Sequence, residues 1–340
     1  MTVAEAQYDV LTMGRSSIDL YSNDIGTPFP EIESFGAFVG GCPTNISVGT
    51  RRLGLRSALL TAVGEDPVGD FIERFLDDEG VETGYIPRKP GYLTSAVVLG
   101  IEPPDKFPIV FYRDNCADLQ LDIDDVLKSP IADSRALLIT GTGLSHEPSR
   151  SATLFAAERA RATGRTVFFD LDFRADQWDD PRAFGVWARA LLPCVDVVMG
   201  TEEEVKVAAL SNALEISIAH SQITSPEIGG DLDAAVDRLI ERAATTLVLK
   251  RGTDGASVYP SEGDVVHAAP FPVEVVNVLG AGDAFASGLI YGVLNDWDWE
   301  RAARMGNACG AIVVTRQGCA NFMAYEREAL DLIEANGGLG

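Results

Sequence analysis

The sequence predicts an α/β protein with a doubly wound, mainly parallel sheet, flanking helices and a small second sheet. From residue 136 onward, short apolar runs alternate with helix-like segments, as expected where helical crossovers join parallel strands. Glycines stand just past several of the helix-like segments, where left-handed caps end helices. Two strand-like runs earlier in the chain form a hairpin pattern instead, which indicates a sheet outside the main one.

The main sheet is expected to begin with a strand at 9–13. A strand at 57–63 follows, and each later strand leads into a helix or a turn. We expect further strands at 136–140, 166–170, 195–199 and 246–249, a hairpin at 256–259 and 265–269, and helices at 43–53, 67–78, 148–162 and 299–315.

The small sheet is expected to combine strands 18–21, 35–39, 94–100 and 107–113, with a Pro-rich turn at 102–106. A flap of this kind can cover a site and exclude water. We therefore expect one domain over 1–340 with an inserted lid, formed by about 15–39 and 92–114. An exposed sheet needs a partner, so the sequence also predicts a homodimer joined through the lids.

The composition restricts the partners. The chain has 27 basic and 51 acidic residues, a formal charge of −24, which argues against nucleic acid or an anionic membrane. Residues 1–9 lack the order of a signal peptide and no apolar run reaches the ~20 residues of a membrane span, so we expect a cytoplasmic protein. Five cysteines without a C-x-x-C pattern, and three scattered histidines, indicate free thiols and no zinc site.

The stretch 276–288 has the pattern of a strand, a tight glycine turn and a helix. Backbone N–H groups at such a turn and the helix dipole form an anion site, beside which Asp283 is our candidate general base. The alternative is that Asp283 only complements the helix N-terminus. A dinucleotide fingerprint is disfavoured because Phe285 occupies the position of its third glycine, and no Walker motif is present.

Other polar residues follow predicted strands. Asp19 could bind sugar hydroxyls or sit in a turn, and Asn45 lies one helical turn after a glycine pair. Arg113 ends a lid strand and could bind a carboxylate or face solvent. The acids at 202–204 could complement a helix dipole, or Glu203 could hold Mg²⁺ through water.

Together these residues resemble the ribokinase-like (PfkB) family of carbohydrate kinases over about residues 8–335, through Gly40-Gly41-x-x-x-Asn45 and Gly280-Ala281-Gly282-Asp283. The resemblance implies ribokinase-like architecture and phosphoryl transfer from MgATP to a primary hydroxyl. It assigns sugar hydroxyls to Asp19, Gly40, Gly41 and Asn45, the anion hole to Gly280, Ala281 and Gly282, the base to Asp283, the nucleotide to Lys250, Gly252, Gly255 and Asn307, and hydrated Mg²⁺ to Glu203.

Within that family, Tyr112-Arg113 and the strand-end group Asp172, Arg174 and Trp178 resemble motifs of keto-deoxy sugar-acid kinases. Tyr112, Arg113 and Arg174 are thus implied to bind the acid. The choice between two keto-deoxygluconate substrates stays open, as do a neutral-sugar or nucleoside kinase and a non-catalytic sensor on the same fold. Asn277 stands where the family usually has aspartate, which leaves a monovalent-cation (K⁺) site beside the anion hole open.

Overall fold

The computed structural model describes residues 6–102, 106–210, 228–243 and 246–339. Its main sheet has eight strands in the order β14-β13-β12-β11-β10-β9-β1-β4, parallel from β4 to β12, with the hairpin β13–β14 added antiparallel. The strands are β1 (Tyr8–Met13), β4 (Ser57–Leu60), β9 (Ser134–Thr140), β10 (Thr166–Asp170), β11 (Val197–Thr201), β12 (Thr246–Lys250), β13 (Ala256–Tyr259) and β14 (Val266–Ala268).

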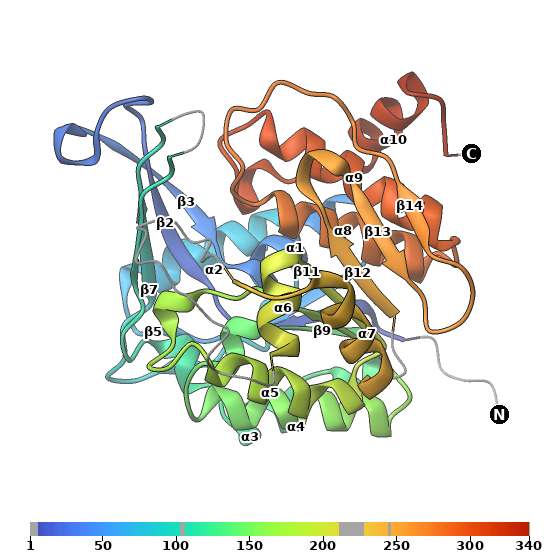
Figure 1. The fold of residues 1–340 in the computed structure, drawn as a ribbon. Coiled ribbons are helices and arrows are strands. Elements are labelled where there is room, and N and C mark those ends of the chain that lie inside the picture. The colour runs from blue at the N-terminus through green and yellow to red at the C-terminus, as the bar shows by residue number, and fades with distance from the viewer. Residues whose placement is uncertain (1–5, 103–105, 211–227, 244–245, 340) are drawn as a thin grey trace.

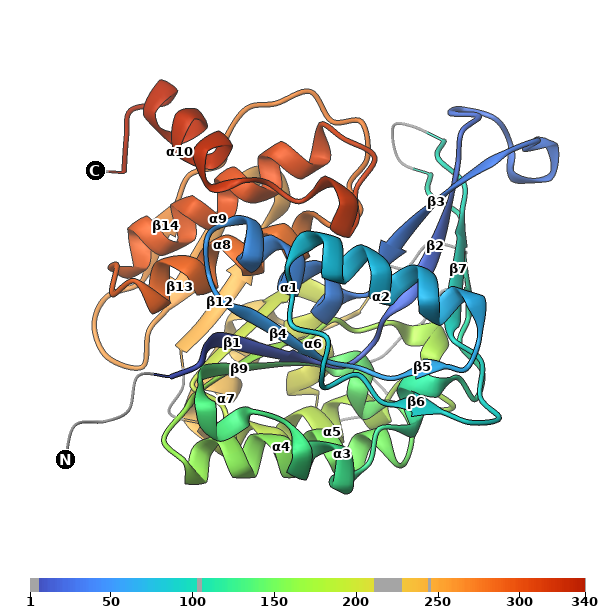
Figure 2. The same ribbon diagram turned by 180° about the vertical axis from the view of Figure 1, so that it is seen from behind.

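Helices cover both faces of this sheet, which confirms the predicted doubly wound architecture (Figures 1 and 2). Val10 and Leu11 show why both faces need a helical layer: successive side chains of a strand point to opposite faces, and both of these are apolar. Val10 packs in a core with Ile46 and Leu289, whereas Leu11 packs in the other core with Ala156. The helices are α1 (Cys42–Arg52), α2 (Pro67–Glu79), α3 (Ile123–Lys128), α4 (Ser149–Ala162), α5 (Ala183–Leu191), α6 (Glu202–Ala209), α7 (Leu232–Ala243), α8 (Ala281–Leu294), α9 (Trp299–Val314) and α10 (Glu326–Ala335).

The small sheet projects from the main body, as the sequence predicted (Figure 1). Its order is β3-β2-β7-β8, formed by β2 (Ser17–Ser22), β3 (Phe35–Gly40), β7 (Ser95–Leu99) and β8 (Ile109–Tyr112). Only the central pair β2–β7 is parallel. Glu102 and Lys106 pair across the expected turn, whose residues 103–105 lie outside the described part of the chain.

The register gives the small sheet two different faces. Asp19 is opposite Phe38 on β3 and Val97 on β7, and Val97 is opposite Phe111 on β8. Directly opposed residues share a face, so these four side chains form what we call the inner face. Ala96 is opposite Tyr112, and both belong to the outer face, where Tyr112 is 61% exposed.

Two expectations about the backbone are wrong. The run 276–278 was expected to be a strand, but it is irregular, because its amide groups at Val276 and Asn277 both donate to the carbonyl of Val314 at the end of α9 rather than to a sheet. The strand expected at 57–63 divides into β4 and a two-residue strand, β5 (Val63–Gly64), which pairs with β6 (Arg88–Lys89). His220 and residues 1–5 lie outside the described residues.

Candidate active site

The first turn of α8 has the features of an anion hole. Gly280 caps the helix with φ +79°, and a Cβ there would stand 3.0 Å from the backbone nitrogen of Cys319, so glycine is required. Among the described residues, the N–H groups of Gly282 and Asp283 have no acceptor, and Ala281 N–H makes only a 3.4 Å contact with the Val278 carbonyl. Unpaired N–H groups at a helix N-terminus attract an anion, as the sequence suggested.

Asp283 lies between this turn and α1. Its Oδ2 accepts a 2.7 Å hydrogen bond from Asn45 Nδ2. Burial raises the pKa of Asp283 above its ordinary value, and the nearby Asp172 raises it further, while the Asn45 bond opposes both. Asn45 Oδ1 is buried without a partner in the described structure and remains available to a ligand hydroxyl.

The glycine pair before α1 makes room for Asp19. A Cβ on Gly40 would lie 2.0 Å from Asp19 Oδ2, and a Cβ on Gly41, where φ is +107°, would lie 2.3 Å from the carbonyl oxygen of Arg15. Asp19 Oδ1 accepts from Ser17 Oγ at 2.7 Å and Oδ2 from Cys319 Sγ at 3.2 Å. Burial raises the pKa of Asp19, and Asp283, which is bonded to Asn45, is close enough to raise it further, so the structure brings the three residues to one region.

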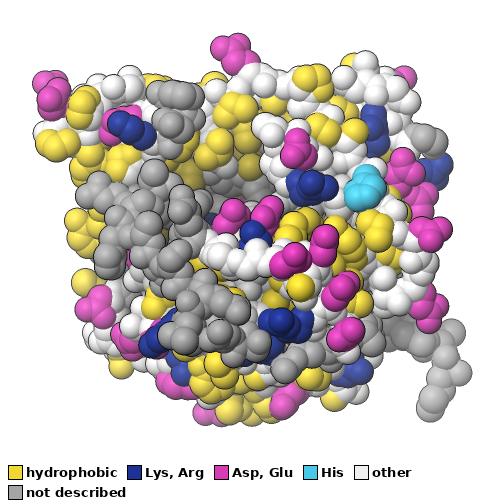
Figure 3. Space-filling model, in the orientation of Figure 1, with side chains coloured by type: hydrophobic (Ala, Val, Ile, Leu, Met, Phe, Trp, Pro, Cys, Tyr) yellow, Lys and Arg dark blue, Asp and Glu magenta, His cyan; other side chains and the backbone are white. Residues whose placement is uncertain are grey.

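Alternating charges follow the carboxyl ends of β10 and β12. Lys250 Nζ donates to both oxygens of Asp170, at 2.9 and 3.0 Å, and lies 3.3 Å from where a Cβ of Gly282 would be. Burial raises the pKa of Asp170 to about 7 despite this cation. Arg174 pairs with Asp172 at 3.0 Å. Figure 3, which views the molecule from the same side as Figure 1, shows acidic and basic side chains gathered around a hollow in the middle of the surface. A lysine beside the anion hole suits a phosphate ligand.

Two of the expected metal and nucleotide residues remain open to solvent. Glu203, in the first turn of α6, is half-buried and has no hydrogen-bond or ion-pair partner among the described residues. Its neighbour Glu204 is instead used in the capping box of α6 and accepts from Phe173 N–H. Gly252 is exposed with φ +57° and open space around it, as a ligand loop requires.

Gly255 and Asn307, which were also expected to face the nucleotide, lie close to the end of β14. A Cβ on Gly255 would lie 2.2 Å from the Ala268 carbonyl. Asn307 Nδ2 donates to the carbonyls of Ala268 and Ala269, at 2.9 and 3.0 Å. Since both amide hydrogens are used, only its Oδ1 can meet a ligand directly.

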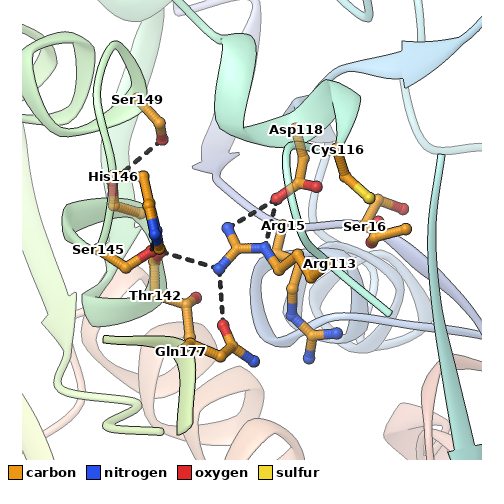
Figure 4. A network of polar contacts seen from close by, with 12 residues as sticks. Arg15, Ser16, Arg113, Cys116, Asp118, Thr142, Ser145, His146, Ser149 and Gln177 are labelled. Atoms are coloured by element: carbon orange, nitrogen blue, oxygen red, sulfur yellow. Dashed lines mark hydrogen bonds and ion pairs between the residues drawn. The ribbon is translucent and has the colours of Figure 1, made fainter. Parts of the chain in front are cut away.

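The expected carboxylate clamp of Tyr112 and Arg113 is wrong in its geometry. Tyr112 points away from the inner face and into solvent. The Arg113 guanidinium is buried: Nε and Nη2 contact Asp118 Oδ2 at 2.8 and 2.6 Å, and Nη1 donates to the Thr142 carbonyl and Gln177 (Figure 4). Four of its five N–H donors are therefore occupied, which leaves no fork for a substrate.

The sequence interpretation missed Arg15, which is buried beside Ser17 and Asp19. A signal was present, because positions 15, 17 and 19 alternate and therefore share one face of an extended segment. It also missed Cys319, whose thiol contacts both Asp19 and the Tyr21 hydroxyl. Nothing local to residue 319 indicates that contact across the fold.

Unpaired N–H groups at a helix N-terminus, with one buried carboxylate beside them and another nearby, are the arrangement expected of a phosphotransferase acting on an alcohol. A family model described as pfkB family carbohydrate kinase matches residues 7–325, and the chain belongs to that family. It is a carbohydrate kinase.

Relatives and solved structures agree with this membership. The chain is 34% identical to 5-dehydro-2-deoxygluconokinase of Geobacillus thermodenitrificans over 327 residues, covering 96% of this chain and 92% of the relative. It is 33% identical to the enzyme of the same name from Bacillus anthracis, covering 96% and 95%. An E. coli protein described as a ribokinase II, in complex with ATP and Mg²⁺, superposes with a TM-score of 0.82 at 25% identity, covering 96% and 99%. Fructokinase with bound ATP from Xylella fastidiosa gives the same TM-score and identity, covering 96% and 98%.

Proposed function

We propose that the chain transfers the γ-phosphoryl group of ATP to the primary hydroxyl of 5-dehydro-2-deoxy-D-gluconate, giving the 6-phosphate. The main structural support for phosphoryl transfer is the 2.7 Å hydrogen bond from Asn45 to Asp283, which lies beside the open anion hole. The substrate assignment rests on the relatives of that name and on the runs 14–21, 40–45, 102–105 and 111–118, which resemble the same enzyme.

Each residue of the site has a separate role in an in-line phosphoryl transfer. Asp283 takes the proton of the attacking hydroxyl, and Asn45 orients the carboxylate for it. The N–H groups of Gly282 and Asp283, with the neighbouring Lys250, meet the charge on the phosphoryl oxygens. Asp19 and the unpartnered Asn45 Oδ1 hold the other hydroxyls, so positioning and electrostatics supply most of the rate.

Mg²⁺ fits this site through Glu203, whose unpaired and half-buried carboxylate can accept hydrogen bonds from metal-bound water. The ion would neutralise charge on the ATP phosphates. Within the described part of the chain no three His, Cys, Asp or Glu side chains are grouped as direct ligands, in keeping with an ion held mainly by water and phosphate.

A K⁺ requirement is not part of the proposal, because Asn277 fills the corresponding place. Its Nδ2 donates to the Gln317 carbonyl and its Oδ1 accepts from Leu279 N–H at 3.1 Å. Asn277 is fully buried. A donor directed at a carbonyl replaces the attraction that a cation would provide, so we infer activity without K⁺.

We further propose a homodimer joined through the outer faces of the small sheets. That face presents apolar side chains, including Val110, which is 42% exposed, and Tyr112. Pairing two such faces would remove this surface from water.

We also propose that the enzyme acts in the cytoplasm, in myo-inositol catabolism. The five cysteines are unpaired, as expected in a reducing compartment, and within the described residues no helix is long and apolar enough to cross a bilayer.

The test is a coupled ADP-release assay of the purified protein with MgATP. The panel contains 5-dehydro-2-deoxygluconate, 2-keto-3-deoxygluconate, fructose and a nucleoside. We expect the highest kcat/KM with the first compound. A preference for 2-keto-3-deoxygluconate, or for a neutral compound, would replace the substrate assignment, and ligand binding without turnover would indicate a sensor instead.

A further inference from the structure

Arg15 carries a buried charge that makes no direct ion pair within the described part of the chain. It is 6% exposed, and Arg113 is the other buried arginine among the described residues. Arg113 is paired with Asp118, whereas no carboxylate of the described chain lies within 4.0 Å of Arg15. Arg15 Nη1 donates to Ser17 Oγ at 3.0 Å, and its Nε is buried with no partner.

Burying a guanidinium without a direct ion pair is unfavourable, and its other contacts, including the more distant Asp19, offset the cost only in part. The guanidinium carbon lies 5.3 Å from the centre of the Phe111 ring, a cation–π contact that is weaker than an ion pair in a desolvated site. A buried cation with an unpartnered N–H donor is suited to an anionic ligand.

The position of Arg15 places this ligand in the sugar site. Phe111, over which it stacks, belongs to the inner face together with Asp19. The Ser17 hydroxyl joins the two groups, since it accepts from Arg15 and donates to Asp19 Oδ1 at 2.7 Å. Burial raises the pKa of Asp19, and Arg15 is the strongest influence opposing that rise.

The other site arginines are already committed. Arg174 is paired with Asp172, and Arg113 is held by Asp118, Thr142 and Gln177 (Figure 4). Arg15 takes no part in either set of contacts. Among these three arginines of the described chain, Arg15 is the one that is buried without a direct ion pair.

We propose that Arg15 binds the carboxylate of the sugar acid and so sets the preference for an acid over a neutral sugar. The primary hydroxyl and the carboxylate stand at opposite ends of a six-carbon acid. With the hydroxyl at Asp283 and the middle hydroxyls at Asp19, the carboxylate reaches Arg15, the next group beyond Asp19 along the Ser17 bridge. This inference rests on the proposed function and identifies the residue that selects its substrate class.

The experiment compares Arg15→Met and Arg15→Lys with wild type on two substrates, the sugar acid and its neutral methyl ester. KM for each, KM for ATP and the melting temperature are measured. Arg15→Met should raise KM for the acid by roughly 10- to 150-fold, the loss expected for a hydrogen bond to a charged group. KM for the ester and for ATP should change little. Arg327→Met serves as the control, because Arg327 is a solvent-exposed arginine paired only with exposed Asp331.

The acid-to-ester ratio separates specificity from general damage, since a folding defect would affect both substrates alike. If Arg15→Met does not fold, Arg15→Lys decides: it keeps the charge but loses the fork, so KM for the acid alone should rise. An active wild type whose acid preference survives both substitutions would overturn the role of Arg15. A wild type inactive on every keto-deoxy sugar acid would overturn the proposed function instead.

Arg113→Lys is measured alongside. It should lower the melting temperature, because it breaks a buried network, while preserving the acid preference. If Arg113→Lys abolishes that preference and Arg15→Met does not, the carboxylate is bound at Arg113 and the proposal fails.

Discussion

Replacing Asp283 by asparagine isolates the proton-accepting role from the shape of the site. The two side chains have nearly the same volume, and an asparagine oxygen can still accept the hydrogen bond from Asn45 Nδ2 that now measures 2.7 Å. The anion-hole N–H groups and the cap at Gly280 stay as they are. Binding of ATP and sugar should therefore persist while the base is lost.

The expected magnitudes follow from the surroundings of Asp283. Loss of a general base should reduce kcat by about 10²- to 10⁴-fold. Burial and Asp172 raise the pKa of Asp283 in the folded enzyme, so the folded state binds the Asp283 proton more tightly than the unfolded chain does. The stability linked to that proton is present at low pH and is lost as the pH rises through the folded pKa. At pH 7.5 the charged carboxylate is thus unfavourable, and Asp283→Asn should melt at or above the wild-type temperature.

The assay combines kcat at saturating substrates with calorimetry at pH 4 and 7.5. In the wild type, kcat should fall on the acid side as Asp283 becomes protonated, and the difference in melting temperature should shrink at pH 4. Glu300→Gln is the matched control, since it removes an exposed first-turn acid from α9. If Asp283→Asn keeps more than about a tenth of wild-type kcat, or behaves like Glu300→Gln, then Asp283 only complements the helix dipole and is not the base.

Three further substitutions test other parts of the site. Gly40→Ala should raise sugar KM by at least about tenfold with ATP KM unchanged, because its Cβ would lie 2.0 Å from Asp19 Oδ2 and displace that carboxylate. Asn277→Asp should create a dependence on K⁺, since it replaces a donor facing the Gln317 carbonyl with an anion; activity is titrated with KCl against a bulky organic cation. Val110→Asp should yield monomers by light scattering, as it places a charge on the outer face.

Each of these three predictions would be contradicted by one result. Unchanged sugar affinity in Gly40→Ala would show that Asp19 does not contact the sugar. Wild-type enzyme that needs K⁺ would refute the role given to Asn277. A wild type that is already monomeric removes the dimer proposal, and a dimeric Val110→Asp moves the interface elsewhere, with Ile123→Asp on α3 as a control for an exposed apolar residue outside the sheet.

Local sequence preferences were enough to predict most of the elements and the candidate residues that depend on a short stretch of chain. β10 matches its expected bounds, and Gly80, one of the glycines just past a predicted helix, ends α2 in the left-handed conformation. Gly280 and Asp283 were identifiable because a glycine turn and the helix after it form within a few residues. Such preferences reflect local sterics and hydrogen bonding, which neighbouring residues already specify.

Packing between distant segments determines which polar groups are free to meet a ligand. Arg113 was a plausible clamp until Thr142 and Gln177, far along the chain, were found on its guanidinium. Arg15 shares a face with Asp19 in the sequence pattern, but only the fold shows that it is buried without a direct ion pair. The strand register alone places the Tyr112 side chain on the outer face. The availability of a donor depends on every segment packed against it, so it is a property of the assembled fold and not of the residues beside it in sequence.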